Sequence, residues 1–431
     1  MTKKISLWLA IFLMVFAMVI TFQLTIIFGD VFFRDEPAGQ VPTEFTEQTD
    51  APAEPDGTEA PAEKTLSDEI TERVSAKIAE IAELYTKYYV GDLDVDDLVE
   101  GAALGFVAYT GDKYGAYHNA EDFAALQQNY SGEFVGIGIS AVLNTDYYAI
   151  EVLNVMPNSP ADEGGFLQND LILAVDGENV ADLGYNEAIS RIRGEAGTEV
   201  TLTVARGEDY SEVFDLTLTR RAVEEQSVTY ETLEVATLFK PVAYIRLMDF
   251  NDTTAQQFID ALNQGQADGV HGYIIDVRNN GGGELSSILD ILDPLLPAGP
   301  MVRIQYKDGT ERVYESGENE FNAPMVVLAN GNTASAAELF VSALKDYQKA
   351  VVVGDVTYGK GTVQSLIPFE DGSALRISTA MYAPPYSDNY EGVGITPDIE
   401  VPLGEEYRGV NLFKVAHEND AQLQAALALY K

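Results

Sequence analysis

The apolar residues of this chain follow different periods in different regions, and these changes predict where its domains lie. Residues 65–88 carry apolar side chains at helical spacing behind a capping-box pattern, and residues 95–109 form a second helical segment. Short strand-like runs separated by Gly, Asn and Pro occupy residues 134–221 and predict a small β-rich domain. From about residue 227, apolar strands alternate with helices. We therefore predict a multidomain α+β protein whose largest part is an α/β body.

The α/β body is predicted from short apolar runs that break at Gly, Asn or Pro. The clearest strands are residues 242–247, 272–277, 324–329 and 350–354, and helices are expected from residues 253 and 285. A further helix follows the third strand, because apolar residues recur at helical spacing from Ala336 to Tyr347. Ser335 therefore lies at a helix start, where unpaired backbone N–H groups and the positive end of the helix dipole are available.

The first residues predict attachment to a membrane. Residues 5–28 carry no formal charge, and the run is longer than the roughly 20 residues that cross a bilayer as a helix. Lys3 and Lys4 precede the run, which favours a cytoplasmic N-terminus. A cleaved signal peptide is the alternative, but no small-x-small cleavage pattern follows the run. We expect a single-pass protein of the cell membrane with the rest of the chain outside the cytoplasm.

These patterns predict the following domain boundaries. The chain divides into a cytoplasmic tip with a transmembrane helix (1–35), an acidic Pro/Ala/Thr-rich linker (36–66), a helical cap region (67–130), the β-rich domain (131–222), the α/β core (223–405) and a C-terminal helical segment (406–431). The linker has too little apolar surface to fold and is expected to be an extended tether. The first helix of the cap region approaches heptad spacing, so it is either a cap that packs on the body or an arm for self-association into a homodimer.

Composition and charge exclude several kinds of function. The chain has 431 residues and a net charge of −43, with 26 basic and 69 acidic residues, which argues against a nucleic-acid partner. It has no cysteine, so a thiol nucleophile and a Cys-ligated metal are excluded. Its three histidines stand at no metal-ligand spacing, and we expect neither a metal nor a cofactor. Covalent catalysis would therefore need Ser, Thr or Lys.

The β-rich domain resembles a PDZ domain on several motifs in the expected order. These are a glycine turn before a strand (133–140), a strand (149–155), Asn-Ser-Pro-Ala (158–161), a strand ending in Asp-Gly (169–177), a helix (185–193) and a strand (200–206). The resemblance implies that a peptide adds as a strand to the sheet edge. It also implies that the backbone N–H groups of one loop hold the peptide's C-terminal carboxylate. That loop comprises Phe134, Val135, Gly136, Ile137, Gly138 and Ile139.

Two motifs in the α/β body match known patterns only in part. Residues 354–360 spell most of a phosphate-binding loop, but the next residue must be Ser or Thr to hold magnesium and is Gly361. Ser342 and Lys345 match SxxK, and residues 387–389 spell Ser-Asp-Asn, as in penicillin-binding enzymes. The Lys-Thr-Gly element that should follow is missing, and helical spacing puts Ser342 and Lys345 toward the solvent side. Neither motif predicts a site.

Ser335 and Lys360 form a more promising pair. A serine hydroxyl is a weak nucleophile until a base takes its proton, and a lysine can be that base when burial lowers its pKa. Gly359 and Gly361 flank Lys360 and allow the backbone to approach closely. Gln364 follows four residues later and could hydrogen-bond the amine and fix its direction.

Three segments of the body resemble the C-terminal processing (tail-specific) peptidases. They are Asn-Thr-Ala-Ser-Ala-Ala-Glu (332–338), Gly-Lys-Gly-Thr-Val-Gln (359–364) and Asp-Val-Arg-Asn-Asn-Gly-Gly-Gly (276–283). Lys360 and Gln364 follow Ser335 at the family's separations of 25 (360 − 335) and 29 (364 − 335) residues. The resemblance runs from about residue 67 to the C-terminus. It implies helices, a PDZ domain and an α/β peptidase core related to the crotonase fold.

The resemblance also implies a role for each site residue. Ser335 would be the acylated nucleophile, Lys360 the general base and Gln364 the residue that orients the base. Oxyanion donors would be the backbone N–H groups of Ala336 and Gly282. Gly281 stands where the family usually has proline. Asp346 matches an aspartate described in some members, but it would lie about 16 Å along the helix from Ser335, so we exclude it.

We therefore predict a membrane-anchored serine endopeptidase that needs no cofactor or metal. Its PDZ domain would hold the accessible C-terminus of a protein or peptide substrate while Ser335 cleaves a peptide bond through an acyl-enzyme. The alternative is a catalytically silent scaffold that only binds peptides through its PDZ domain.

Overall fold

The computed structural model describes residues 64–207, 209–235, 238–318, 320–404, 412 and 415–430. Two compact units are separated at residue 112: the described helices before it form one, and the chain from Asp112 onward forms the other. The predicted transmembrane helix and nearly all of the predicted linker lie outside the described residues. Among the helices that are described, none is long and apolar enough to cross a membrane.

The described part of the smaller unit consists of two helices, α3 (Leu66–Tyr88) and α4 (Val95–Ala108), and the turns beside them. The predicted capping box is present, because the Thr65 hydroxyl accepts the Asp68 amide at 3.2 Å and the Asp68 carboxylate accepts the Thr65 amide at 3.0 Å. No residue of either helix is buried. Both the cap and the self-association arm therefore stay predictions.

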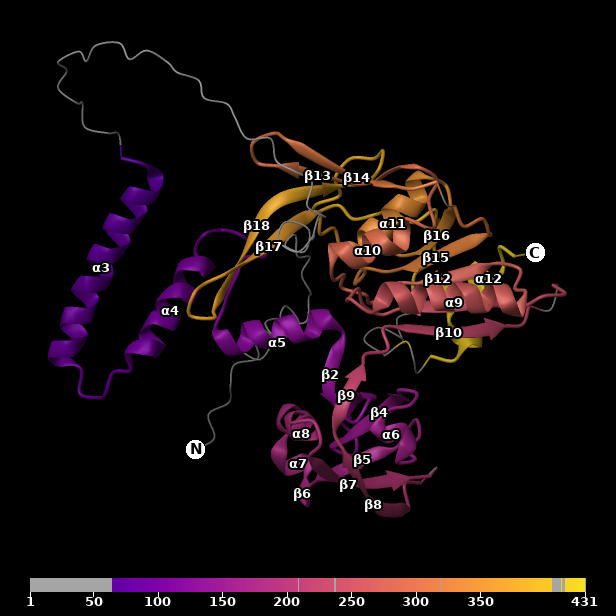
Figure 1. Cartoon of the computed structure of the whole chain (residues 1–431), viewed down its shortest axis with the longest axis horizontal. Helices are drawn as coiled ribbons and strands as arrows, with labels where there is room; N and C mark the ends of the chain where they lie inside the picture. The colour runs from indigo at the N-terminus through magenta and orange to yellow at the C-terminus, as the bar shows by residue number, and fades with distance from the viewer. Residues whose placement is uncertain are drawn as a thin grey trace, which may run out of the picture. The chain divides into compact units, whose positions relative to one another are not determined.

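The β-rich domain is an antiparallel sheet with short helices packed against it. Its strands run in the order β3-β4-β5-β7-β8, so β3 is an edge strand. The elements are β3 (Ile139–Asn144), β4 (Ala149–Val155), α6 (Pro160–Glu163), β5 (Leu171–Val175), β6 (Glu178–Asn179), α7 (Val180–Leu183), α8 (Tyr185–Ile192), β7 (Glu199–Arg206) and β8 (Glu212–Thr219). Figure 1 shows that the chain enters and leaves this domain through the paired strands β2 (Glu133–Gly136) and β9 (Arg221–Glu224).

A six-stranded sheet forms the centre of the α/β body. Its order is β10 (Val228–Leu233), β11 (Val242–Leu247), β12 (Tyr273–Asp276), β15 (Met325–Ala329), β16 (Ala350–Gly354) and β19 (Ile399–Glu400). All pairs are parallel except β10 with β11. The carboxyl ends of the parallel strands therefore meet at one edge, where loops commonly carry ligand and catalytic residues. The four predicted strands match β11, β12, β15 and β16 closely, whereas β10 and β19 were not predicted.

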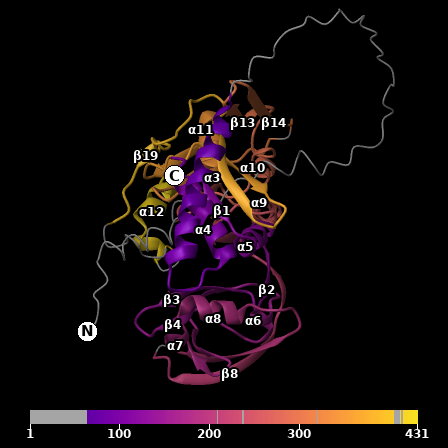
Figure 2. The same cartoon turned by 90° about the vertical axis from the view of Figure 1, so that its left-hand side faces the viewer.

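Helices cover both faces of this sheet. Alternate residues of each strand point to opposite faces, so Ile245 joins one apolar cluster and Tyr244 another. The first cluster includes residues of α9 (Thr254–Asp268), α10 (Leu285–Leu292) and α11 (Ala336–Asp346). The second includes residues of α12 (Ala421–Leu427), which Figure 2 shows on the side away from α9. The C-terminal helix is thus part of the core of the body.

A second, antiparallel sheet belongs to the same unit. It contains β1 (Ala116–His118), β18 (Ala374–Ala383), β13 (Gly299–Tyr306) and β14 (Glu311–Ser316) in that order, and β17 (Thr362–Pro368) also pairs with β18. The sequence patterns above did not predict this sheet. The helix α5 (Ala120–Ser131) packs beside it, because Tyr130 is buried against Leu366 of β17.

Candidate active site

Ser335 occupies a strained turn between β15 and α11. It is the N-cap residue of α11, as predicted, and has φ = +56° and ψ = −121°. Positive φ in a residue other than glycine costs about 1–3 kcal/mol and is typical of functional turns. The side chain is fully buried, and its Oγ makes no hydrogen bond with the described residues. The turn therefore fixes the backbone at Ser335, while no hydrogen bond joins its Oγ to the Lys360 Nζ, so the hydroxyl remains available to a base and a substrate.

Glu338 connects the turn that carries Ser335 with the loop that carries Lys360. Its Oε2 accepts the backbone N–H of Ser335 at 2.9 Å and that of Lys360 at 2.8 Å. Its Oε1 accepts the Gly359 N–H at 2.7 Å and the Thr357 hydroxyl at 2.5 Å. Burial raises the pKa of Glu338 above its usual value, although these donors oppose the rise. One buried carboxyl group thus positions the backbone of both candidate catalytic residues.

Lys360 lies in a tight glycine loop before β17, and only 3% of its surface is exposed. Burial lowers the pKa of its amine to about 8, helped by Arg376 and Lys113 and opposed by Glu338 and Glu391. The loop passes close to its neighbours: a Cβ on Gly359 would lie 2.8 Å from the Gly394 nitrogen. An amine with this pKa is neutral in a useful fraction of molecules near neutral pH, as a general base must be.

Gln364 lies on β17 close to the lysine loop and is almost fully buried. Its Nε2 donates to the backbone oxygen of Thr362 at 3.2 Å and to the Thr362 hydroxyl at 3.0 Å. A longer contact of 3.4 Å reaches the Ser378 hydroxyl on β18. The side chain is therefore fixed in the site, and its predicted action on Lys360 stays a prediction.

Gly282 packs directly against the nucleophile turn. A Cβ added there would lie 2.8 Å from the Ser335 Cβ and 2.9 Å from the Ala336 nitrogen, and φ is +108°. Only glycine can therefore occupy this position. Its N–H donates to the Asn280 side chain at 2.8 Å, so it would have to leave that acceptor to bind an oxyanion. Ala336 is the first residue of α11, where a backbone N–H has no acceptor within the helix.

A buried ion cluster supports the loop that carries Gly282. Arg278 donates to Asp276 at 2.7 Å and to Asp420 at 2.7 Å. Burial acts to raise the pKa of Asp276, but the Arg278 guanidinium outweighs it and holds that pKa below its usual value. Asp276, Arg278 and Glu338 lie within the recognised motifs, but the sequence predicted no role for them. Each is a charged residue within or beside an apolar run. Because charged side chains are rarely buried without a partner, this position could have indicated a buried, paired charge.

The residues of the rejected motifs have structural roles. The Ser342 hydroxyl donates to the Leu339 carbonyl at 3.1 Å, and Lys345 contacts the Thr396 carbonyl at 2.6 Å. Ser342 is buried, so the solvent-side placement predicted for it was wrong: α11 is packed on more sides than its apolar stripe suggests. Asp346 accepts the backbone N–H groups of Tyr386 and Ser387 at 2.8 Å each, which explains it without a catalytic role. Among the described residues, no acidic or histidine cluster could hold a metal.

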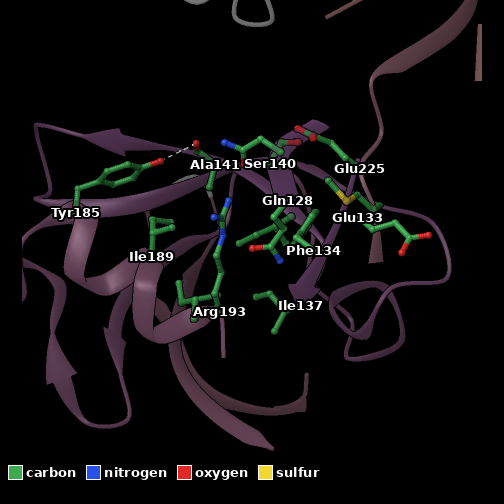
Figure 3. Close-up of a pocket in the computed structure, with 16 residues that line it drawn as sticks. Gln128, Glu133, Phe134, Ile137, Ser140, Ala141, Tyr185, Ile189, Arg193 and Glu225 are labelled. Carbon is green, nitrogen blue, oxygen red and sulfur yellow. Dashed lines mark hydrogen bonds between the residues drawn. The ribbon is translucent and has the colours of Figure 1, made fainter. Parts of the chain in front are cut away.

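A second candidate site is a groove in the β-rich domain, between β3 and α8. This pocket has a volume of about 360 Å³ (Figure 3). Five of the six predicted carboxylate-loop residues line it, and these are Phe134, Gly136, Ile137, Gly138 and Ile139. Val135 is not among the lining residues, and residues 133–136 form the strand β2, which pairs with β9. The turn itself is therefore shorter than predicted.

Residues from outside the β-rich domain also line this groove. Gln128 and Asn129 of α5 and Glu225 after β9 are among its lining residues. Figure 3 shows Gln128 and Glu225 near Arg193, which follows α8 within the domain. The Tyr185 hydroxyl donates to the Ala141 carbonyl on β3 at 3.0 Å, so the helix is hydrogen-bonded to the edge strand across the groove.

The two sites define a class of protein, a serine-type peptidase with a peptide-binding domain, and comparison with known proteins identifies its family. The model of peptidase family S41 matches residues 241–401, and a PDZ domain model matches residues 151–206. A carboxyl-terminal-processing protease of Synechocystis sp. is 35% identical over 313 residues, which are 72% of this chain and 71% of that protein. The chain belongs to peptidase family S41 and to its carboxy-terminal-processing proteases.

Other relatives agree with this assignment. The carboxy-terminal-processing protease of Bartonella bacilliformis is 31% identical over 358 residues, which are 81% of this chain and 80% of that protein. A crystal structure described as an S41 protease from Bacteroides fragilis has a TM-score of 0.51 and 18% identity, covering 79% of this chain and 92% of that one. The second match supports the fold alone. The protein is therefore a serine peptidase with a PDZ domain, as predicted.

Proposed function

We propose that Ser335 and Lys360 form the catalytic dyad of this peptidase. The observation that carries the proposal is Glu338, whose single carboxylate accepts the backbone N–H groups of both residues. Lys360 takes the Ser335 proton as Oγ attacks the substrate carbonyl, and the resulting ammonium then protonates the leaving amine. The Ala336 N–H and the glycine loop at Gly282 stabilise the oxyanion. Water hydrolyses the acyl-enzyme in the second half of the reaction, with Lys360 again as the base and Gln364 as its orienting neighbour.

The proposal includes a role for the PDZ domain in choosing where cleavage occurs. The substrate tail adds as a strand to the edge strand β3, and its carboxylate enters the turn at Ile137 and Gly138. Support comes from the groove, which these residues line together with the apolar side chains of α8. Tyr185→Phe would remove the hydrogen bond between α8 and Ala141 and is expected to tighten tail-peptide binding about two- to fivefold, measured by fluorescence anisotropy. Weaker binding would contradict this arrangement of the groove.

We further propose that residues 5–28 anchor the protein in the cell membrane, with the peptidase outside the cytoplasm. The uncharged run and the two lysines before it support this orientation. External protease added to intact cells should remove the body and leave the N-terminal tip protected.

The apolar stripe of α3 supports self-association, which light scattering of the detergent-extracted protein would measure. A monomer at micromolar concentration would contradict self-association without affecting the dyad.

The dyad is tested by Ser335→Ala and Lys360→Ala, compared with Ser342→Ala and Lys345→Ala. Ser342 and Lys345 lie on α11, which Ser335 begins, and Lys360 lies in the loop before β17; only Ser335 and Lys360 belong to the proposed chemistry. The first two variants should fold and lose cleavage of labelled casein by at least about 10³-fold. The two controls should keep activity within a few-fold. A serine-reactive acylating probe should label the wild type and not Ser335→Ala. Full casein cleavage by either dyad variant would refute the proposal.

A further inference from the structure

The segment that joins the two units passes directly over the candidate base. Residues 112–115 lie between α4 and β1, and the Lys360 Nζ stands 5.1 Å from the centroid of the Tyr114 ring. This distance places the amine over the face of the ring, within the range of a cation–π contact. Tyr114 belongs to none of the motifs by which the site was recognised, and about 220 residues separate it from the nucleophile.

The Tyr114 ring is held by contacts at its hydroxyl. The hydroxyl donates to Glu391 Oε1 at 3.2 Å and accepts from the Lys113 Nζ at 2.9 Å. Glu391 Oε2 in turn accepts the backbone N–H of Gly361 at 2.7 Å. Glu391 therefore contacts both the aromatic cover and the lysine loop beneath it, and it sets the separation between them.

The backbone on either side of the ring is fixed to β18. Asp112 accepts the Ser378 backbone N–H and the Ser378 hydroxyl, both at 2.7 Å. Arg376 donates through Nε to the Tyr114 carbonyl at 2.9 Å, and β1 then pairs with β18 from Ala116 onward. The segment is thus attached before, at and after Tyr114, so the position of the ring does not depend on Lys360.

We propose that Tyr114 is a positioning residue for Lys360, holding its amine in place and excluding water from it during peptide-bond cleavage. This inference rests on the proposed dyad and adds to it a residue from the N-terminal side of the PDZ domain. Glu391 is the residue through which the cover and the lysine loop keep their spacing.

The ring has two opposing effects on the amine, and the structure indicates which is larger. Contact with the ring face favours the ammonium form, whereas removal of water favours the neutral form. Glu338 on α11 and Glu391 also favour the ammonium form, while Arg376 on β18 and Lys113 oppose it. The pKa of Lys360 nevertheless lies well below its usual value, and burial is the largest cause. Loss of the cover should therefore raise this pKa.

The test is the pH dependence of kcat/KM for labelled casein in the full-length protein, with Tyr114→Ala and Tyr114→Phe. In Tyr114→Ala the acid limb should move about one unit or more to higher pH, and kcat/KM at pH 7 should fall about tenfold or more. The loss should be recovered as the pH is raised. In Tyr114→Phe the ring remains, held by the backbone contacts on either side of it, but it loses its hydroxyl contacts with Glu391 and Lys113, so the limb should move less than in Tyr114→Ala. An equal loss at every pH in Tyr114→Ala, without a shift, would overturn the inference.

Tyr114→Leu distinguishes the exclusion of water by the side chain from the electrostatic contact with the ring face. It also tests whether a folding defect explains the result. Leucine keeps most of the apolar cover and removes the ring, so its acid limb should lie at or below the wild-type position. An upward shift as large as that of Tyr114→Ala would overturn the role of water exclusion. Thermal unfolding shows whether each variant is folded. Failure of the dyad itself would instead appear as full casein cleavage by Ser335→Ala, so the two results are distinguishable.

Discussion

The two sheets of the peptidase body supply the two halves of the site in different ways. The parallel sheet carries Ser335 just beyond β15, a strand buried along its whole length. The antiparallel sheet carries Lys360 just before β17, a strand that is buried in part and exposed at its far end. The nucleophile is therefore placed by strand burial and a helix start, whereas the base is placed by specific polar contacts around a glycine loop.

Because of this difference, substitutions in one region should mainly affect stability, and substitutions in the other should mainly affect catalysis. Substitutions at the end of the parallel sheet remove buried contacts on which the fold depends. Substitutions around the lysine loop change the position or charge of the base and leave most of the core intact. Glu338 belongs to both regions, since it lies on α11 and accepts donors from the lysine loop.

The largest effect is expected at the parallel sheet, in Arg278→Met. The change leaves the carboxylates of Asp276 and Asp420 buried without their partner, so the free energy of unfolding should fall by about 3–5 kcal/mol. Denaturant unfolding measures it. The matched control is Arg303→Met on the antiparallel sheet, where a partly exposed ion pair with Glu311 and two hydrogen bonds to the Pro384 and Ser387 carbonyls are lost, so the fall should be about 1–2 kcal/mol. Equal losses in the two variants would remove the contrast between the sheets.

The next effect is expected where the two sheets meet, in Glu338→Ala. Four donors lose their acceptor, so Ser335 and Lys360 should lose their common alignment, and kcat/KM should fall about 10²-fold or more. Casein cleavage measures the loss, and Ser335 labelling should slow in parallel. Glu284→Ala, near the same end of the body, is the control and should retain most activity. Normal kinetics in Glu338→Ala would show that the two halves are positioned independently.

A smaller effect concerns the stability cost of the base. The pKa of Lys360 is about 8 in the folded protein and about 10.5 when unfolded, so between these values the unfolded chain binds more protons. Wild-type stability should therefore rise with pH across this window, and at pH 7 the full cost of burying the ammonium is present. Lys360→Met should be more stable by about 1–2 kcal/mol at pH 7, and the difference should shrink by pH 10.5. Thermal unfolding at both pH values checks the sign, and a constant difference would contradict the linkage.

The smallest effect is expected for Gln364→Ala on β17. The side chain lies beside the lysine loop and contacts Thr362 and Ser378, so its loss should lower kcat/KM about tenfold or less. The loss of stability in Gln364→Ala should be smaller than the loss in Arg278→Met. An unfolded Gln364→Ala protein would show that this part of the antiparallel sheet is as dependent on buried polar contacts as the parallel sheet.

The strands of the parallel sheet were predictable because they are buried on both faces. Such strands have continuous apolar runs, and Val242–Leu247 and Met325–Ala329 show them clearly. The strands of the antiparallel sheet in the peptidase body were missed because their apolar and polar residues follow no clear pattern. Glu311–Ser316 alternates between exposed and more buried positions, and Ala374–Ala383 combines apolar and polar residues with partial burial. Pairing of Ala116–His118 with β18 joins residues more than 250 positions apart, which local periodicity does not reveal.

By itself, the sequence determined the domain order, the helix start at Ser335 and the identity of the candidate catalytic residues, because these depend on local patterns and on motif spacing. Only the tertiary structure decided how the site is assembled. It showed that Glu338 joins the two loops, that Asn280 holds the Gly282 N–H and that Tyr114 covers Lys360. The contacts of Glu338 with the lysine loop and of Tyr114 with Lys360 join segments that meet only when the two sheets and their loops pack together, and the Asn280 contact, although local, depends on the folded geometry of its loop. Burial, which lowers the pKa of the lysine, likewise exists only in the folded chain.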